Sequence, residues 1–129
     1  MSLMTSLKVL VVDDEEIVRH TLKALLNHHG CQVDCAEDGN SGLRALEDGR
    51  YDVVFVDLRM PGLDGLGFLS RSKKIRPHIP VIIITGHGSN DTREEALAAG
   101  AFGFLDKPFR FSDIRDLVGK VKPASHPQP

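Results

Sequence analysis

A chain of 129 residues with 41% hydrophobic and 26% charged residues is long enough, and apolar enough, for one globular domain with a single core. Its formal net charge is −2 with acids and bases interspersed, so we expect no basic surface for direct nucleic-acid binding. No apolar run approaches the roughly 20 residues that a membrane-spanning helix needs, and no secretory signal is visible, so a cytoplasmic location is expected.

The first half of the chain alternates between strand-like and helix-like segments. A strand is predicted over residues 7–12 and a helix over 15–29, ended by Gly30. We expect this helix to bury one face, formed by Ile17, Val18, Leu22, Leu25 and Leu26. A short strand over 32–36 follows, and Asp38 is positioned to cap a helix over 39–48 that stops at Gly49.

The two cysteines, Cys31 and Cys35, fall at this short second strand. Four residues of strand separate two Cα atoms by about 13 Å. Because a disulfide needs roughly 4.4–6.8 Å between these atoms, we predict two free thiols, as is usual in a reducing compartment.

The second half continues the alternation, with predicted strands over 51–56, 81–84 and 102–105. Asp64 is expected to cap a helix that ends near residue 75. Thr92 is expected to open a capping box for a helix ended by Gly100, and Ser112 to cap a last helix that runs to 121. We expect one domain over 6–121, followed by a disordered tail or the start of a linker over 122–129.

Five predicted strands in strict alternation with five predicted helices indicate an α/β fold. The strands are continuously apolar, which is typical of a parallel sheet covered on both faces by helices. With right-handed crossovers the sheet becomes doubly wound, and ligands of such sheets bind at the carboxyl ends of the strands.

Polar residues gather at these expected strand ends. Asp13 and Asp14 follow the first strand, Asp57 ends the third, Thr85 ends the fourth and Lys107 comes after the fifth. Taken singly, an acid after a strand is more often a turn former or helix N-cap than a functional residue. Clustered carboxylates repel one another and lose solvation, and a divalent cation offsets this cost. Among such cations, Mg²⁺ prefers oxygen ligands and keeps water or phosphate in its shell.

This set of residues is typical of phosphoryl transfer. Mg²⁺ and Lys107 would neutralise the charge on the transferring oxygens, while the Thr85 hydroxyl and the Gly86 amide would donate hydrogen bonds to them. The expected nucleophile is a carboxylate, because His87 is the only histidine at this edge of the sheet and no cysteine lies there. Asp57 stands alone after a buried strand, whereas the adjacent acids Asp13 and Asp14 suit metal binding.

Four motifs, in order and with matched spacing, resemble the receiver domains of two-component response regulators. They are Val11-Val12-Asp13-Asp14-Glu15, Val56-Asp57-Leu58-Arg59-Met60-Pro61 with Gly65, Ile84-Thr85-Gly86, and Leu105-Asp106-Lys107-Pro108-Phe109. The resemblance covers about residues 6–121. It implies a flavodoxin-like fold with strand order 2-1-3-4-5, an order that comes from the family and not from the residues.

The resemblance also implies roles for individual residues. Asp57 would accept a phosphoryl group from a histidine kinase or a phosphotransfer protein, and Lys107 would contact that group. The side chains of Asp14 and Asp57 and the backbone carbonyl of Arg59 would hold Mg²⁺, with Asp13 acting mainly through a water molecule. The peptide bond between Lys107 and Pro108 would be cis.

A switch pair is implied as well, formed by Thr85 and Phe104. The phosphoryl group would draw the Thr85 hydroxyl inward, and Phe104 would rotate into the vacated space. The surface of the fourth helix, fifth strand and fifth helix would then change. A downstream effector domain or protein would read this change, or a second copy in a phosphorylation-dependent homodimer.

Two other interpretations stay open. The first is a Mg²⁺-dependent aspartyl-phosphate phosphohydrolase of the haloacid dehalogenase type, although those enzymes usually carry a second acid where this chain has Arg59. The second is a degenerate receiver that binds partners without phosphorylation, against which the complete set of signature residues argues. We therefore expect a signalling switch that catalyses only its own phosphorylation and dephosphorylation and is no free-standing enzyme.

Two of three further positions, His87 and Phe102, allow two interpretations each. Arg59 and His87 flank the acceptor and are expected to tune the lifetime of the phosphoryl group, but His87 could equally be a solvated loop residue. Phe102 is either ordinary packing or, if exposed, an apolar spot on the expected readout face.

Overall fold

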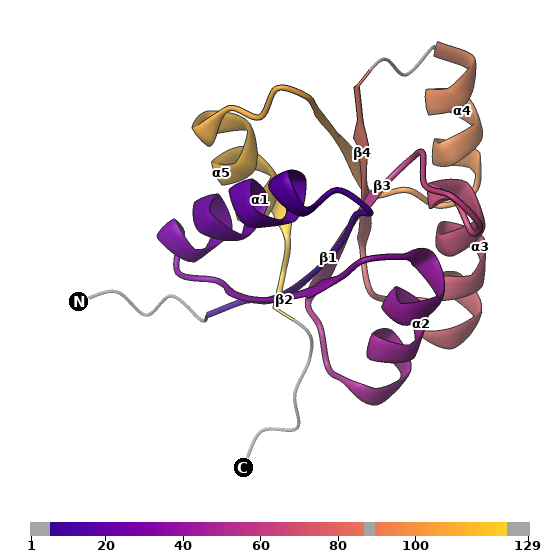
Figure 1. Ribbon diagram of the computed structural model, residues 1–129, viewed down its shortest axis with the longest axis horizontal. Helices are drawn as coiled ribbons and strands as arrows, with labels where there is room; N and C mark the ends of the chain where they lie inside the picture. Colours follow the sequence, from indigo (N-terminus) through magenta and orange to yellow (C-terminus); the bar gives the residue numbers. More distant parts are fainter. Residues whose placement is uncertain (1–5, 87–89, 124–129) are drawn as a thin grey trace.

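In the computed structural model, which describes residues 6–86 and 90–123, five parallel strands form one sheet between two layers of helices (Figure 1). The strands are β1 (Lys8–Val12), β2 (Gln32–Ala36), β3 (Val53–Asp57), β4 (Val81–Thr85) and β5 (Gly103–Asp106). Their order is β2-β1-β3-β4-β5, and every neighbouring pair is parallel. The predicted doubly wound α/β fold and strand order are confirmed.

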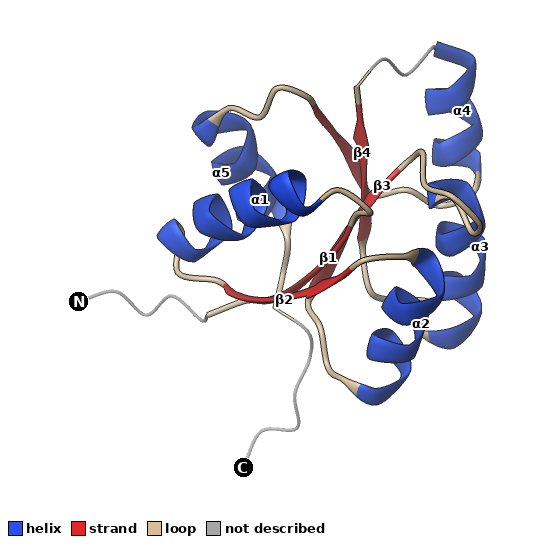
Figure 2. Cartoon of the chain, in the orientation of Figure 1, coloured by secondary structure: helices blue, strands red, loops and turns tan. Residues whose placement is uncertain are grey.

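The helices alternate with the strands along the chain (Figure 2). They are α1 (Glu16–His28), α2 (Gly39–Asp48), α3 (Gly65–Ile75), α4 (Asn90–Ala98) and α5 (Phe111–Lys120). Two separate clusters of buried side chains assign each helix to a face of the sheet. One cluster contains side chains from α2, α3 and α4, and the other contains side chains from α1 and α5.

The third strand, β3, runs through the middle of the core. All five residues of β3 are buried, because successive side chains point to opposite faces and both faces are covered. Val54 and Val56 pack toward α2 and α3, whereas Val53 and Phe55 pack toward α1 and α5. The end of this strand is therefore held from both sides, which fixes Asp57 at the edge of the core.

Two of the predicted helix caps are confirmed and two are wrong. The side chain of Asp38 accepts a hydrogen bond from the Ser41 amide at 2.7 Å, and the side chain of Asp64 accepts one from the Gly67 amide at 2.8 Å. In contrast, α4 begins at Asn90, so Thr92 lies inside its first turn. Helix α5 begins at Phe111 with Arg110 as N-cap, so Ser112 also lies in a first turn.

The shifted helix starts have a common physical reason. Serine, threonine and acidic residues are favoured throughout the first turn of a helix as well as at the cap itself. A local pattern therefore locates the start of a helix only to within one or two residues.

The expected buried face of α1 needs one correction, at Ile17. Leu22 and Leu26 are fully buried and Leu25 packs against the same cluster, but Ile17 is 71% exposed. A helix turns by about 100° per residue, so Ile17 lies roughly 140° from Leu22 and on the opposite side from Leu26. Its apolar side chain thus faces solvent at the first turn of α1.

Two smaller expectations, on the cysteines and on the glycines that end helices, are also confirmed. Cys31 and Cys35 are free thiols. Gly30 and Gly100, which were expected to end helices, have φ values of +87° and +103°, in the left-handed region that glycine adopts most easily. Among the described residues, no helix is both long and apolar enough to cross a membrane.

Candidate functional site

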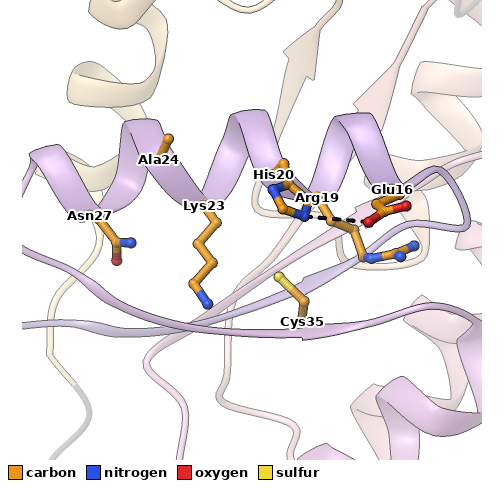
Figure 3. Close-up of a pocket in the computed structure, with 7 residues that line it drawn as sticks. All are labelled: Glu16, Arg19, His20, Lys23, Ala24, Asn27 and Cys35. Atoms are coloured by element: carbon orange, nitrogen blue, oxygen red, sulfur yellow. Dashed lines mark ion pairs between the residues drawn. The ribbon is translucent and has the colours of Figure 1, made fainter.

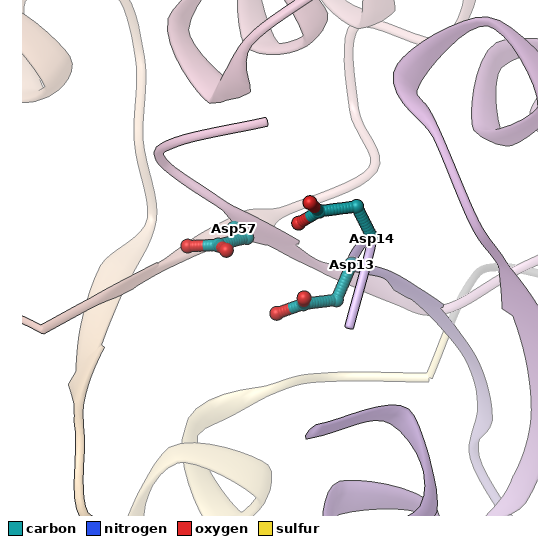
Figure 4. A group of neighbouring side chains, drawn as sticks. All are labelled: Asp13, Asp14 and Asp57. Atoms are coloured by element: carbon teal, nitrogen blue, oxygen red, sulfur yellow. The ribbon is translucent and has the colours of Figure 1, made fainter. Parts of the chain in front are cut away.

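Three carboxylates meet where β1 and β3 end. Asp13, Asp14 and Asp57 each contribute one carboxylate oxygen to a group of three oxygens that lie within 4.8 Å of one another (Figure 4). The two strands are neighbours in register, with Val12 opposite Val56, which brings the following residues together. Asp13 is fully buried and Asp57 is 6% exposed, whereas Asp14 is open to solvent. The predicted acidic residues therefore form a cluster with one open side.

Burial makes two of these carboxyl groups unusually weak acids. The pKa of Asp13 rises to about 6, mainly because burial disfavours the charged form, and the nearby charges of Asp57 and Asp14 add to this rise. Burial likewise raises the pKa of Asp57, against the opposing charge of Lys107. A positive group placed among these oxygens would relieve both effects.

Lys107 supplies such a positive group at the end of β5. Its Nζ lies 3.7 Å from Asp57 Oδ2 and 3.6 Å from Glu15 Oε1. The backbone holds the lysine in place, because its amide donates a hydrogen bond to the Thr85 carbonyl at 2.9 Å. The peptide bond between Lys107 and Pro108 is cis, as the family resemblance implied.

Glu15 is the site residue that sequence analysis left without a role. It follows the predicted acidic pair directly, and its ion pair with Lys107 places it in the pocket beside Asp57. The available signal was its position next to Asp13 and Asp14. Nothing in the linear pattern showed that the lysine, which lies 92 positions later in the chain, would be its partner.

A pocket of about 250 Å³ opens over the Asp57 carboxylate. Seven residues line it: Glu15, Asp57, Leu58, Arg59, Thr85, Gly86 and Lys107. Three of the predicted contact residues, Thr85, Gly86 and Lys107, are thus brought together around Asp57. Arg59 is also at the pocket, and its amide approaches Asp57 Oδ1 at 3.5 Å, a long contact that points one carboxylate oxygen toward the backbone.

Two buried oxygens at this site lack a hydrogen-bond partner among the described residues. They are Asp13 Oδ2 and Thr85 Oγ1. A buried polar atom without a partner costs about 1–3 kcal/mol, so such atoms usually have a purpose. Oxygen atoms of this kind suit a hard divalent cation or a phosphoryl group, which would satisfy them.

Asp57 also lies against the start of α3, at Gly65. The Gly65 amide donates a hydrogen bond to the Leu58 carbonyl at 3.0 Å. A Cβ atom added at Gly65 would lie 2.6 Å from the Asp57 carbonyl oxygen and 2.7 Å from the Leu58 Cα, closer than real Cβ atoms come to backbone. Only glycine therefore lets the helix approach the end of the strand that carries Asp57 this closely.

The predicted switch residues lie on neighbouring strands. Thr85 is the last residue of β4 and is 3% exposed, and Phe104 on β5 stands opposite Ile83 and packs, partly buried, against the α2–α4 side of the core. Phe102, just before β5, is 42% exposed and so forms an apolar spot on the surface. His87 lies outside the described residues.

A larger pocket of about 430 Å³ lies elsewhere, between α1 and β2 (Figure 3). Arg19, His20 and Lys23 line it together with Cys35. Burial raises the pKa of the Cys35 thiol more than Lys23 and Arg19 lower it, so the thiol is not activated as a nucleophile. The residues predicted for phosphoryl transfer line the smaller pocket over Asp57 instead.

The sequence and the fold match those of known proteins. Residues 9–119 match the family model of the response regulator receiver domain. The DNA-binding transcriptional regulator NtrC of Salmonella typhimurium is 42% identical over 121 residues, which make up 93% of this chain and 25% of that protein. The chain thus spans about a quarter of the length of NtrC. Sporulation initiation phosphotransferase F of Bacillus subtilis is 38% identical over 116 residues, 90% of this chain and 94% of that protein.

Two solved structures agree with these matches. The chemotaxis protein CheY4 of Vibrio cholerae superposes with a TM-score of 0.86 at 29% identity, covering 92% of this chain and 100% of that one. The receiver domain of NtrX from Brucella abortus superposes with a TM-score of 0.82 at 36% identity, covering 87% of this chain and 95% of that one.

Proposed function

Because the chain belongs to the family of response regulator receiver domains, which are phosphorylation-activated switches of two-component signalling, we propose that Asp57 is its phosphoryl acceptor. One observation carries the proposal. Asp57 is a nearly buried carboxylate at the end of a core strand, with the Lys107 ammonium 3.7 Å from its Oδ2 and two further acids beside it. Among the residues that the structure describes, only this carboxylate combines burial, a paired cation and a place in the pocket.

In the proposed reaction, a carboxylate oxygen of Asp57 attacks the phosphorus of a phosphohistidine on a donor protein. The phosphorus–nitrogen bond breaks as the phosphorus–oxygen bond forms, and the histidine leaves with the electron pair. Lys107 neutralises charge on the transferring oxygens, and the Thr85 hydroxyl and the Gly86 amide donate hydrogen bonds to them. The pocket over Asp57 brings these groups together.

Receiver domains bind Mg²⁺ at an acidic pocket, and the residues of this chain fit that ion. Asp14 and Asp57 by side chain and Arg59 by its carbonyl would hold it, with Asp13 acting through water. The partnerless Asp13 Oδ2 and the purely oxygen donor set support this assignment. Mg²⁺ would supply positive charge to the transferring phosphoryl oxygens.

The proposed readout uses Thr85 and Phe104. When the Thr85 hydroxyl turns toward a phosphoryl group on Asp57, it vacates space into which the Phe104 ring rotates. The surface of α4, β5 and α5 then changes. A ligand or modification can shift such an equilibrium only through contacts that differ between the two states, and the partnerless Thr85 hydroxyl is a group able to make such a contact.

The partners follow from the same role. We propose a sensor histidine kinase or a phosphotransfer protein as donor. For readout we propose a downstream effector domain or protein, with a phosphorylation-dependent homodimer as a further outcome. The working unit is residues 6–121, in the cytoplasm, and it acts on itself without turning over an external substrate. The hydrolase interpretation has less support, because Arg59 stands where those enzymes carry their second acid.

The decisive experiment measures phosphoryl incorporation. The protein is incubated with Mg²⁺ and acetyl phosphate, and the intact mass is compared for the wild type, Asp57→Asn and Asp48→Asn, a control at an exposed acid on α2. We expect one phosphoryl group on the wild type and the control and none on Asp57→Asn. Equal labelling of all three proteins would sink the proposal, and sustained release of phosphate from phosphate esters would favour the hydrolase.

A further inference from the structure

The guanidinium group of Arg93, on α4, lies against two side chains of β5. Its Cζ is 4.8 Å from the centroid of the Phe104 ring, in a cation–π contact, and its Nη2 forms an ion pair with Asp106 Oδ1. Phe104 and Asp106 are two residues apart on the strand, so their side chains point to the same face. One arginine thus holds both of them from the neighbouring helix.

Helix α4 buries few of its described side chains. Over residues 92–98, the part of α4 whose side chains are described, Ala96 is the only residue that is fully buried. Arg93 precedes it by three positions and therefore shares its face of the helix. A single methyl group offers little contact area, and the larger, half-buried Arg93 side chain adds direct contacts between α4 and β5.

Of the two residues that Arg93 contacts, one belongs to the proposed switch pair and the other lies beside it. Asp106 stands opposite Thr85 in the sheet and directly precedes Lys107, while Phe104 is the proposed switch aromatic. In this geometry Thr85 Oγ1 donates to no group of the described chain, so the hydroxyl is not engaged with the Asp57 carboxylate. Arg93 thus contacts Phe104 in a conformation in which the Thr85 hydroxyl makes no hydrogen bond to Asp57.

We infer that Arg93 is a positioning residue that clamps Phe104 and Asp106 to α4 and thereby opposes rotation of the switch. When Thr85 engages a phosphoryl group on Asp57 and Phe104 rotates, the stack on Phe104 loosens and α4 loses this contact with β5. This inference rests on the proposed roles of Asp57, Thr85 and Phe104. It adds a residue that sets how readily the switch responds.

The clamp is expected to be modest in strength. The Arg93 side chain is 32% exposed and the Asp106 side chain is 63% exposed, so solvent screens their ion pair. A partly exposed cation–π contact shifts a two-state equilibrium by about two- to five-fold. A shift of this size changes how readily the switch responds to phosphorylation, but it does not prevent the response.

The test uses beryllofluoride with Mg²⁺ as a phosphoryl mimic. Its apparent Kd is measured by NMR for the wild type, Arg93→Gln and Arg93→Lys. We expect binding about two- to five-fold tighter for Arg93→Gln, because the opposing clamp is gone. The Kd of Arg93→Lys should lie between those of the wild type and Arg93→Gln, since lysine keeps the charge but loses the planar stack. Arg115→Gln is the matched control, because it removes an exposed ion pair to Asp116 on α5 and should leave the Kd unchanged.

A double-mutant cycle separates clamping from general stability. In a Phe104→Leu background the ring is absent, so Arg93→Gln should cause at most a small further change in Kd. An arginine that only stabilises the fold would lower Tm and leave the Kd of both backgrounds unaltered, which would overturn the inference. If Arg93→Gln fails to fold, Arg93→Lys still decides the question by its Kd.

The outcomes also distinguish this inference from the function it rests on. Wild-type protein that is phosphorylated on Asp57, together with an unchanged Kd in Arg93→Gln and Arg93→Lys, would refute the clamp alone. Wild-type protein that neither takes up a phosphoryl group nor binds beryllofluoride would refute both.

Discussion

The ammonium of Lys107 and the carboxylate of Glu15 form an ion pair of 3.6 Å at the mouth of the pocket. The same ammonium is 3.7 Å from Asp57 Oδ2, so its charge is divided between the proposed acceptor and a flexible, exposed acid. Glu15 therefore competes for the cation that phosphoryl transfer needs, and it adds negative charge where an anionic donor must approach.

Replacing this acid should accelerate the reaction. We expect Glu15→Gln to raise the rate of phosphorylation by acetyl phosphate by about two- to five-fold, the range for losing one exposed ion pair. Glu16→Gln is a close control, because Glu16 is the next residue and pairs with His20 at 3.6 Å instead. The rates are measured by mass spectrometry of quenched samples, and an unchanged or slower rate in Glu15→Gln would show that Glu15 does not compete for Lys107.

The raised pKa of Asp13 predicts how stability depends on pH. The carboxyl has a pKa of about 6 in the folded protein and an ordinary value of 3.8 when exposed, so the folded state binds its proton more tightly. The resulting stability is fully present below about pH 4 and is lost as pH rises through about 6. Above that pH the charged, buried Asp13 destabilises the fold.

A neutral residue should remove this loss. We expect Asp13→Asn to raise the free energy of unfolding at pH 7.5 in the presence of EDTA by about 2–3 kcal/mol, and to change it little at pH 4. Urea unfolding at the two pH values measures the difference, with Asp116→Asn as an exposed control. Millimolar Mg²⁺ should stabilise the wild type more than Asp13→Asn, and equal stabilisation of both would count against a metal at this cluster.

Two glycines in helices provide a matched pair for a packing prediction. A Cβ at Gly65 would collide with the backbone of Asp57 and Leu58, whereas a Cβ at Gly119 would meet nothing within 4 Å. We expect Gly65→Ala to cost about 1–3 kcal/mol of unfolding free energy and to slow phosphorylation, because α3 must move away from the acceptor.

The control variant, Gly119→Ala, should change the free energy of unfolding in the opposite direction. Gly119→Ala should stabilise α5 by up to about 1 kcal/mol, since alanine is the better helix former, and leave the phosphorylation rate unchanged. Thermal unfolding and labelling are measured on both variants. A Gly65→Ala protein as stable and as active as the wild type would show that the helix can yield without disturbing Asp57.

The fold was predictable because its pattern is local and repeated. Each core strand is a continuous apolar run, and each is followed by residues with helical spacing, so the elements could be read from the chain. Asp13, Asp57, Thr85 and Lys107 could be placed at one edge because parallel strands all present their carboxyl ends there. The family motifs then supplied the strand order, which no local pattern contains.

The errors and omissions share a different cause. Ile17 was assigned to the wrong side of α1 because a set of apolar residues was read as one stripe without following the 100° rotation of each residue. The pairing of Glu15 with Lys107 and the stacking of Arg93 on Phe104 join distant segments. Such contacts depend on side-chain reach across the assembled fold, which the linear sequence does not specify.

The two ends of the sheet differ in the residues that they present. The carboxyl ends of the strands and the loops that follow them contain every residue proposed for chemistry, whereas the turn between α3 and β4 at the opposite end contains none of them. His78 in that turn is exposed and lies outside the core clusters. A spectroscopic label attached at His78 would therefore leave the pocket over Asp57 untouched.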